Sequence, residues 1–144
     1  MKMTDALLGE HALFYPLFDG VEELLFTATN VQELRAAFKV LERAVLSHAS
    51  IEEEVLFPAL IASRVAGGPL TVMRQEHQDI DRRVVAFYAL ADLEAAKDAL
   101  RAIVAHLRTH FRQEEQLLFP MCEATLGEAK LLALGEVWAK KRGL

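Results

Sequence analysis

A histidine and a glutamate four residues apart occur twice in this chain, and each pair precedes the same Leu-Phe-Pro sequence. The first pair is His48 and Glu52, and the second is His110 and Glu114. Four residues are close to one turn of an α-helix, so each imidazole and its carboxylate share a face, about 6 Å apart along the axis. Imidazole nitrogens and carboxylate oxygens are both metal ligands. The repeat therefore predicts two ligand pairs for one ion or for two neighbouring ions.

Further histidines extend the repeat. His11 and His77, each preceded by a glutamate, stand ahead of the first and second copies of the longer motif. Each copy would then contribute one single histidine and one histidine-glutamate pair. The fifth histidine, His106, lies one turn before His110 and shares a broad helix face with it. It is a candidate ligand, and the alternative is a histidine at the edge of the core that hydrogen-bonds to a neighbour or orients a ligand.

The elements that must position these residues are helices, because strand-like alternation is absent and glycine and proline are confined to a few points. Asn30, with Glu33 three residues later, has the form of a helix-opening pair, and Asp92 suits the first residue of another helix. Gly67, Gly68 and Pro69 separate the two halves of the chain, and Gly127 interrupts it again.

These signals predict an all-α protein, an up-down-up-down antiparallel four-helix bundle with a short additional C-terminal helix. We expect a single domain over residues 1–144, because a chain of this length can bury a sufficient core. Its expected parts are a first hairpin over 1–65, a second over 69–125, and a C-terminal helix over 127–144. In the last helix, Leu131, Leu134 and Trp138 are expected to pack against the side of the bundle.

The candidate ligands fall on the apolar face of each predicted helix, which advances by steps of three and four residues. Burying an ionised carboxylate or an unpaired imidazole costs several kcal/mol unless a partner compensates. Six such groups would exceed the ~5 to 15 kcal/mol stability of a domain. No lysine or arginine occupies these inward positions. A bound metal is therefore the expected source of the compensating charge.

Composition excludes several other classes of function. The formal net charge is -5, and no basic stripe is longer than Lys140-Lys141-Arg142, so we do not expect nucleic-acid binding. No apolar run approaches the ~18 to 20 residues of a membrane span. The N-terminus lacks the pattern of a secretory signal, and a single cysteine cannot form an internal disulfide. We therefore expect a cytoplasmic protein.

With these motifs assembled, the chain up to about residue 125 resembles the hemerythrin-like family, also called the HHE cation-binding domain. That family carries a His, a His-x3-Glu, a second His and a second His-x3-Glu on four bundled helices. The resemblance implies a non-haem di-iron centre, in which two iron ions carry a bridging oxo or hydroxo group. It also implies that each hairpin supplies two histidines to one iron, that the two glutamates bridge the irons, and that one coordination position is open for dioxygen or nitric oxide. The matching residues here are His11, His48, Glu52, His77, His110 and Glu114.

The chain departs from the animal oxygen carriers of that family, which place a pair of histidines on the third helix. Here Met73 stands one turn before His77, and His106 could supply a fifth nitrogen from another helix. A site rich in imidazole favours reversible binding or sensing of dioxygen, nitric oxide, redox state or iron level. A sensor of this kind would need an unidentified protein partner. The alternatives are a di-iron enzyme with peroxide-consuming or oxidase-like activity, or a helical interaction module with a structural metal such as zinc.

The acidic neighbours of the candidate ligands are expected to serve other roles. Glu53 and Glu115 lie 100° or more around the helix from the inward face, so solvent exposure is the first interpretation. Glu10 and Glu76 also turn outward, although either could accept a hydrogen bond from a ligand. Pro58 and Pro120, which follow the repeated motif, are expected to kink or end their helices.

Overall fold

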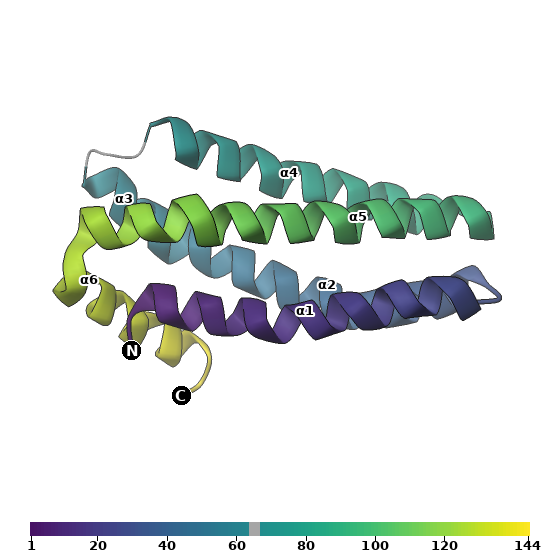
Figure 1. Ribbon diagram of the computed structural model, residues 1–144, viewed down its shortest axis with the longest axis horizontal. Helices are drawn as coiled ribbons and strands as arrows, with labels where there is room; N and C mark the ends of the chain where they lie inside the picture. Colours follow the sequence, from purple (N-terminus) through teal and green to yellow (C-terminus); the bar gives the residue numbers. More distant parts are fainter. Residues whose placement is uncertain (64–66) are drawn as a thin grey trace.

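In the computed structural model, which describes residues 1–63 and 67–144, four long helices lie side by side (Figure 1). The connections from α1 to α2 and from α4 to α5 lie at one end, and α3 and the start of α6 lie at the other. No strand occurs in these two ranges, so the all-α prediction is confirmed. The predicted end of the first hairpin, at residue 65, lies outside the described residues. The elements are α1 (Met3–Thr27), α2 (Val31–Ile51), η1 (Glu52–Leu56), α3 (Phe57–Ala62), α4 (Gly68–Ala89), α5 (Leu93–Gln113), η2 (Glu114–Leu118) and α6 (Phe119–Lys141).

Helix starts follow the predicted capping residues. The Asn30 side chain accepts a hydrogen bond from the backbone N–H of Glu33 at 3.0 Å, and the Asp92 side chain accepts one from Ala95 at 2.8 Å. Each satisfies a backbone donor that has no partner within its own helix. Both predicted helix starts are therefore confirmed.

Two π-helical turns replace the kinks expected at Pro58 and Pro120. The backbone N–H of Phe57 donates to the carbonyl of Glu52, and that of Phe119 donates to the carbonyl of Glu114. A proline lacks an N–H and its ring clashes with the carbonyl four residues earlier, so a wider turn before it accommodates both defects. The helical path continues through each proline. Each π-helical turn begins at one of the two candidate ligand glutamates.

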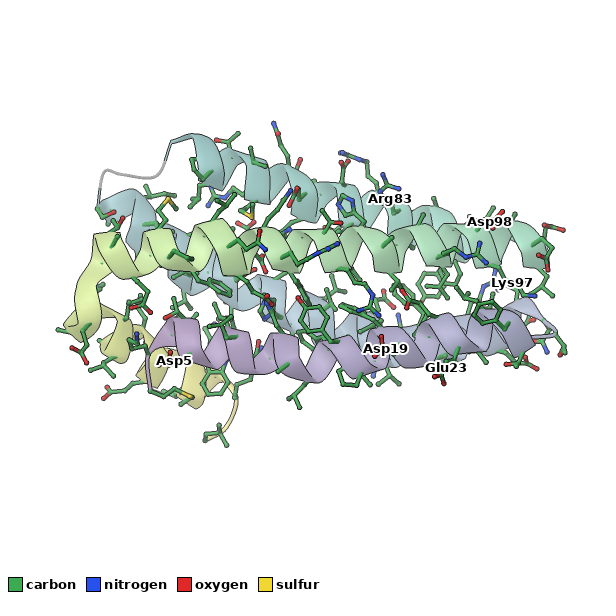
Figure 2. All side chains as sticks on the ribbon, in the orientation of Figure 1. Asp5, Asp19, Glu23, Arg83, Lys97 and Asp98 are labelled. Atoms are coloured by element: carbon green, nitrogen blue, oxygen red, sulfur yellow. The ribbon has the colours of Figure 1, made fainter. Side chains whose placement is uncertain are left out.

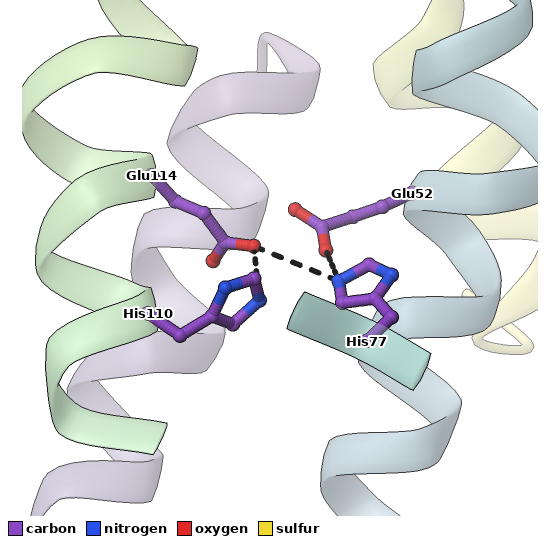
Figure 3. Close-up of side chains that lie close together, drawn as sticks. All are labelled: Glu52, His77, His110 and Glu114. Carbon is purple, nitrogen blue, oxygen red and sulfur yellow. Dashed lines mark ion pairs between the residues drawn. The ribbon is translucent and has the colours of Figure 1, made fainter. Parts of the chain in front are cut away.

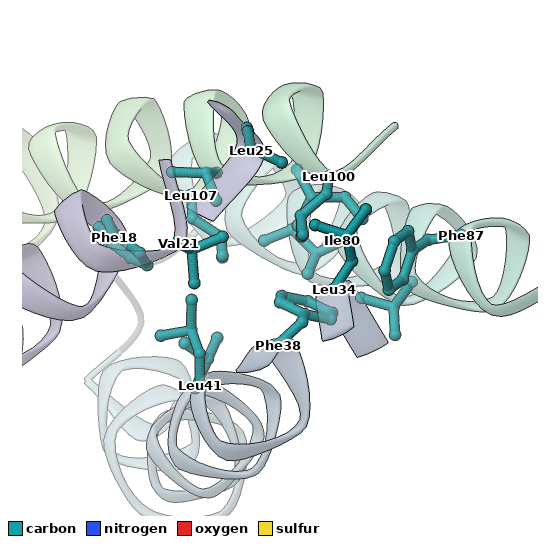
Figure 4. Packing of buried hydrophobic residues seen from close by; sticks show 14 of the residues in the cluster. Phe18, Val21, Leu25, Leu34, Phe38, Leu41, Ile80, Phe87, Leu100 and Leu107 are labelled. Carbon is teal, nitrogen blue, oxygen red and sulfur yellow. The ribbon is translucent and has the colours of Figure 1, made fainter. Parts of the chain in front are cut away.

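The core consists of two apolar clusters that lie on either side of the histidines and glutamates. The larger cluster fills the bundle between α1, α2, α4 and α5, where Phe18, Phe38 and Phe87 are fully buried (Figure 4). The smaller cluster joins the start of α1 to α3 and α6. Each large buried apolar side chain contributes about 1.5 to 3 kcal/mol. The charged side chains of Asp19, Glu23 and Asp98 lie on the outer surface (Figure 2).

The C-terminal part of α6 folds back on the bundle at Gly127, which has φ 71° and ψ 165°. Leu131, Leu134 and Trp138 are buried in the smaller cluster, which confirms the predicted packing of the last helix. Gly135 lies against the backbone of Met1, where a β-carbon would collide with the Met1 carbonyl oxygen. This close approach brings the C-terminal part of α6 beside the N-terminus (Figure 1).

None of the helices in the described part of the chain has both the length and the apolar character that crossing a membrane requires.

Gly127→Ala should destabilise the protein, because the backbone conformation of Gly127 is almost restricted to glycine and costs another residue about 1 to 3 kcal/mol. Gly20→Ala is the matched control, since Gly20 is exposed within α1 and, apart from its chain neighbours and the backbone of its own helix, no atom lies within 4 Å of the position that an alanine β-carbon would take. That change should stabilise the protein by about 0.5 to 1 kcal/mol. Thermal unfolding measures the stability of both variants. Equal changes of the same sign would contradict the conclusion that the backbone conformation of Gly127 requires glycine.

Candidate metal centre

Six side chains from all four long helices and both π-helical turns converge in the bundle interior. Their ligand atoms form two groups, in each of which the atoms lie within 4.8 Å of one another. Glu114 belongs to both groups, so the two groups adjoin. Figure 3 shows the first group. The first group is Glu52, His77, His110 and Glu114, and the second is His11, His48 and Glu114.

The two carboxylates lie between the histidines of both hairpins. Glu114 oxygens lie 3.0 Å from His11 Nε2 and 2.8 Å from His110 Nε2. Glu52 oxygens lie 3.5 Å from His77 Nε2 and 3.8 Å from His48 Nε2. These approaches lack hydrogen-bond geometry, so within the described residues all four oxygens of Glu52 and Glu114 are buried without a hydrogen-bond partner. Buried carboxylate oxygens in this state need a compensating positive charge, which a bound cation or protons can supply.

The outer nitrogen of each histidine, Nδ1, contacts a different carboxylate. Two of the four contacts join different hairpins, because the glutamates of the π-helical turns contact histidines of the other hairpin. The four pairs are His48 with Glu10 at 2.6 Å, His110 with Glu76 at 2.6 Å, His11 with Glu115 at 2.9 Å, and His77 with Glu53 at 3.0 Å. Solvent exposure was the first interpretation for Glu53 and Glu115, and both side chains are partly exposed, but each also contacts a histidine. Glu10 and Glu76 were expected either to face solvent or to accept a hydrogen bond from a ligand, and each accepts one from a candidate ligand.

These outer contacts determine where each imidazole carries its proton. An ionised carboxylate can only accept a hydrogen bond, so Nδ1 of each histidine is the donor. In the neutral ring, Nε2 then carries a lone pair that faces the interior. His11 Nε2 and His48 Nε2 lie 3.1 Å apart, a distance at which two lone pairs repel unless a proton or a metal cation lies between them. The donor set therefore fits a bound cation.

Without a metal, protons would have to supply the missing charge. Burial opposes protonation of His48, but the charge of Glu52 and the contact with Glu10 outweigh it and raise the pKa of His48 to about 10. Burial likewise opposes protonation of His77, whose pKa nearby carboxylates raise to about 10. Burial and the neighbouring charge of Glu114 raise the pKa of Glu52. The close approach of imidazoles overcomes burial at Glu114 and lowers its pKa.

Aromatic rings enclose the candidate ligands. Phe111 stacks on the His11 ring with centroids 4.0 Å apart and planes 5° apart, and Phe57 lies nearly parallel to the His77 ring at 5.8 Å. Both phenylalanines are buried. They limit the access of bulk water to this part of the site.

A cavity of about 570 Å³ opens on one side of the site, between α2 and α4. Its inner wall includes His48, His77 and His110, and Glu53 and Arg74 also line it. His77 is the most accessible of the six converging residues, with 11% of its side chain exposed. Small molecules can therefore approach the histidines from this side.

His106 lies apart from both groups of converging atoms. It is half-buried on α5, and its pKa is lowered by burial and by the charge of Arg83. Its Nε2 is buried and has no hydrogen-bond partner within the described residues. The structure brings together the other six predicted ligands and does not bring His106 to them. Met73 also stays outside both groups and packs in the smaller apolar cluster.

The contributors that were not identified from the sequence include two residues at the C-terminal end of α6. Trp138 Nε1 and Arg142 Nε donate to Glu10 at 2.8 and 2.7 Å. No spacing rule connects residues so distant in the chain, and only the folded position of α6 reveals them. By contrast, Glu53 and Glu115 carried a signal, because a second glutamate follows the candidate ligand in both copies of the motif.

Metal-free protein should lose thermal stability as the pH rises from about 6.5 to about 10. The folded-state pKa of His48 and His77 lies above their ordinary value of 6.5. Their stabilising contribution is therefore complete below pH 6.5 and disappears as the pH passes through about 10. Melting temperatures of metal-free and metal-loaded protein across this range test the prediction. A metal-free protein whose melting temperature stays constant or rises would contradict it.

The family comparison agrees with this geometry. A family model described as the hemerythrin HHE cation binding domain matches residues 2–122, with a further match over residues 87–133. No curated protein and no solved structure is similar enough to match the chain. The matched region contains every residue of the two converging groups. The chain therefore belongs to the hemerythrin HHE cation-binding domain family.

Proposed function

We propose that this protein binds two iron ions and uses them for reversible binding or sensing of a small molecule such as dioxygen or nitric oxide. The observation that carries the proposal is the convergence of four inward-facing Nε2 atoms on two buried carboxylates whose oxygens have no hydrogen-bond partner in the described residues. Membership of a cation-binding family supports the same conclusion.

Each hairpin would supply two histidines to one ion. His11 and His48 would hold the first ion, and His77 and His110 would hold the second, in line with the two groups of converging atoms. Glu114 belongs to both groups, so we expect both ions to share it, together with Glu52 and a bridging oxo or hydroxo group. In this assignment His106 holds neither ion and lies on α5 beside the site.

Iron suits this donor set better than zinc. Zinc sites in proteins commonly use three or four ligands, whereas six nitrogen and carboxylate donors converge here. Carboxylate-rich di-iron bundles activate oxygen, and their sites contain four glutamates with two histidines. The proportion here is reversed, with four imidazoles and two carboxylates. We expect a nitrogen-rich pair of irons to supply reversible binding of a small molecule.

This chain's own residues would control access and protonation. The cavity between α2 and α4 would admit the small molecule to the side of His77 and His110. The outer carboxylates would hold a proton on each Nδ1 and keep each Nε2 directed inward. Phe57 and Phe111 would keep bulk water from the histidine rings they cover.

A di-iron enzyme is the second candidate, and the cavity supports it. A volume of about 570 Å³ lies within the range of sites that bind organic ligands, and a diatomic molecule needs far less space. Turnover of peroxide or of an organic substrate by the iron-loaded protein would favour this alternative. A single bound zinc with no affinity for iron would favour a structural metal instead.

Protein purified without chelator should contain two irons per chain. Exposure of the reduced protein to dioxygen or nitric oxide should produce a new visible absorption band, and removal of the gas should reverse it. Metal analysis and anaerobic spectroscopy measure the two quantities separately. Iron content near zero would contradict the proposal, and an irreversible band would argue against reversible binding.

His110→Ala should lower the iron content and the melting temperature together, because metal binding adds its free energy to folding. His106→Ala is the matched control, as this histidine lies on the same helix but outside both groups. The control should keep two irons per chain. Equal iron loss in both variants would show that His106 is a ligand, and unchanged iron in both would remove His110 from the site.

A further inference from the structure

Glu10 is the outer carboxylate with the most elaborate surroundings. Its Oε2 contacts His48 Nδ1 at 2.6 Å, and its Oε1 accepts hydrogen bonds from Trp138 Nε1 at 2.8 Å and Arg142 Nε at 2.7 Å. The two donors belong to the C-terminal end of α6 and its cap, more than 120 residues away in the chain. Glu10 itself is 9% exposed. Both oxygens of Glu10 therefore have polar partners.

Arg142 also binds the helix that carries His48. Its Nη1 donates to the Ser47 side chain at 2.6 Å, and its Nη2 donates to the Ser47 carbonyl at 3.3 Å. Ser47 immediately precedes His48. One guanidinium thus connects the glutamate that contacts the imidazole with the backbone that carries it, and its rigid fork of donors suits this task.

The corresponding glutamate of the second hairpin has no such support. Glu76 contacts His110 as Glu10 contacts His48, but its other neighbour is the side-chain amide of Gln113, whose NH2 group lies within hydrogen-bond distance. Among the described residues, no lysine or arginine forms an ion pair with Glu76. The internal repeat is therefore unsymmetrical at this point, and α6 causes the difference.

We propose that Trp138 and Arg142 are positioning residues for His48, acting through Glu10, and that docking of the C-terminal part of α6 tightens the first metal position selectively. The inference rests on the proposed function, since it concerns the ion that His11 and His48 would hold. Trp138 and Arg142 are four residues apart, so one helical face presents both to Glu10. Hydrogen bonds to both of its oxygens fix Glu10, and Glu10 in turn fixes the orientation of the His48 ring.

The test is an anaerobic calorimetric titration of metal-free protein with Fe²⁺. Arg142→Gln should lower the affinity for one of the two ions by about 10- to 100-fold and leave the other unchanged. Trp138→Phe keeps an aromatic ring in the core and removes only the N–H donor, so it should weaken the same ion less. A wild-type protein that binds no Fe²⁺ would refute the proposed function itself, whatever the variants do.

Lys141→Gln is the matched control. Lys141 adjoins Arg142 and pairs with Glu54 at 2.6 Å, and Glu54 contacts none of the four histidines. This variant should bind both ions as the wild type does. If Lys141→Gln weakens one ion as much as Arg142→Gln does, the effect comes from general loosening of the helix and the proposal is wrong.

A double-mutant cycle separates positioning from a general structural role. If Arg142 acts through Glu10, then Arg142→Gln should cause no further loss of affinity in a Glu10→Gln protein. Additive losses, or an equal loss for both ions in parallel with the melting temperature of the metal-free protein, would overturn the proposal. If the wild type binds two Fe²⁺ ions and the variants give either of these two results, the inference about α6 is wrong and the proposed function still stands.

Discussion

Charge balance around two buried glutamates is the constraint on which the rest of this bundle depends. Glu52 and Glu114 are fully buried, and two apolar clusters close the bundle on either side of them. Four imidazoles surround them, but neutral imidazoles with Nδ1 protonated offer only lone pairs to the interior. A cation satisfies the carboxylates and the inward nitrogens together. Without a metal, protons must either charge the histidines or neutralise a carboxylate, and the pKa values of His48, His77 and Glu52 are all raised.

Local features of the chain place these groups with little freedom. Each candidate ligand glutamate begins a π-helical turn that ends before a proline, so the same backbone defect recurs at the same position of both motifs. A defect of this kind is costly in an ordinary helix and is often found at functional sites. Phe57 and Phe119 complete these turns and are themselves buried. The repeated Leu-Phe-Pro thus supports the site through the backbone as well as through packing.

The sequence was sufficient to predict the helices and the six converging residues, because both follow from the spacing of apolar and polar positions along single helices. Spacing could not predict the role of Glu53. A residue about 100° from the centre of the buried face lies at the edge of that face, and the residue that it contacts depends on how the adjacent helix is placed. Spacing also made His106 a candidate ligand because it shares a broad face with His110, although His106 belongs to neither group of converging atoms. Trp138 reaches Glu10 only because Gly127 redirects α6.

The crossed contacts of the outer carboxylates have a consequence for how the two halves of the chain cooperate. Glu115 of the second half orients His11 of the first, and Glu53 of the first half orients His77 of the second. Reciprocal contacts of this kind, in which each half supplies the same group to the other, also occur at two-fold symmetric interfaces. Neither half contains all the groups that orient its own histidines. A complete centre therefore exists only when both halves are folded and docked, which makes its assembly an all-or-none event.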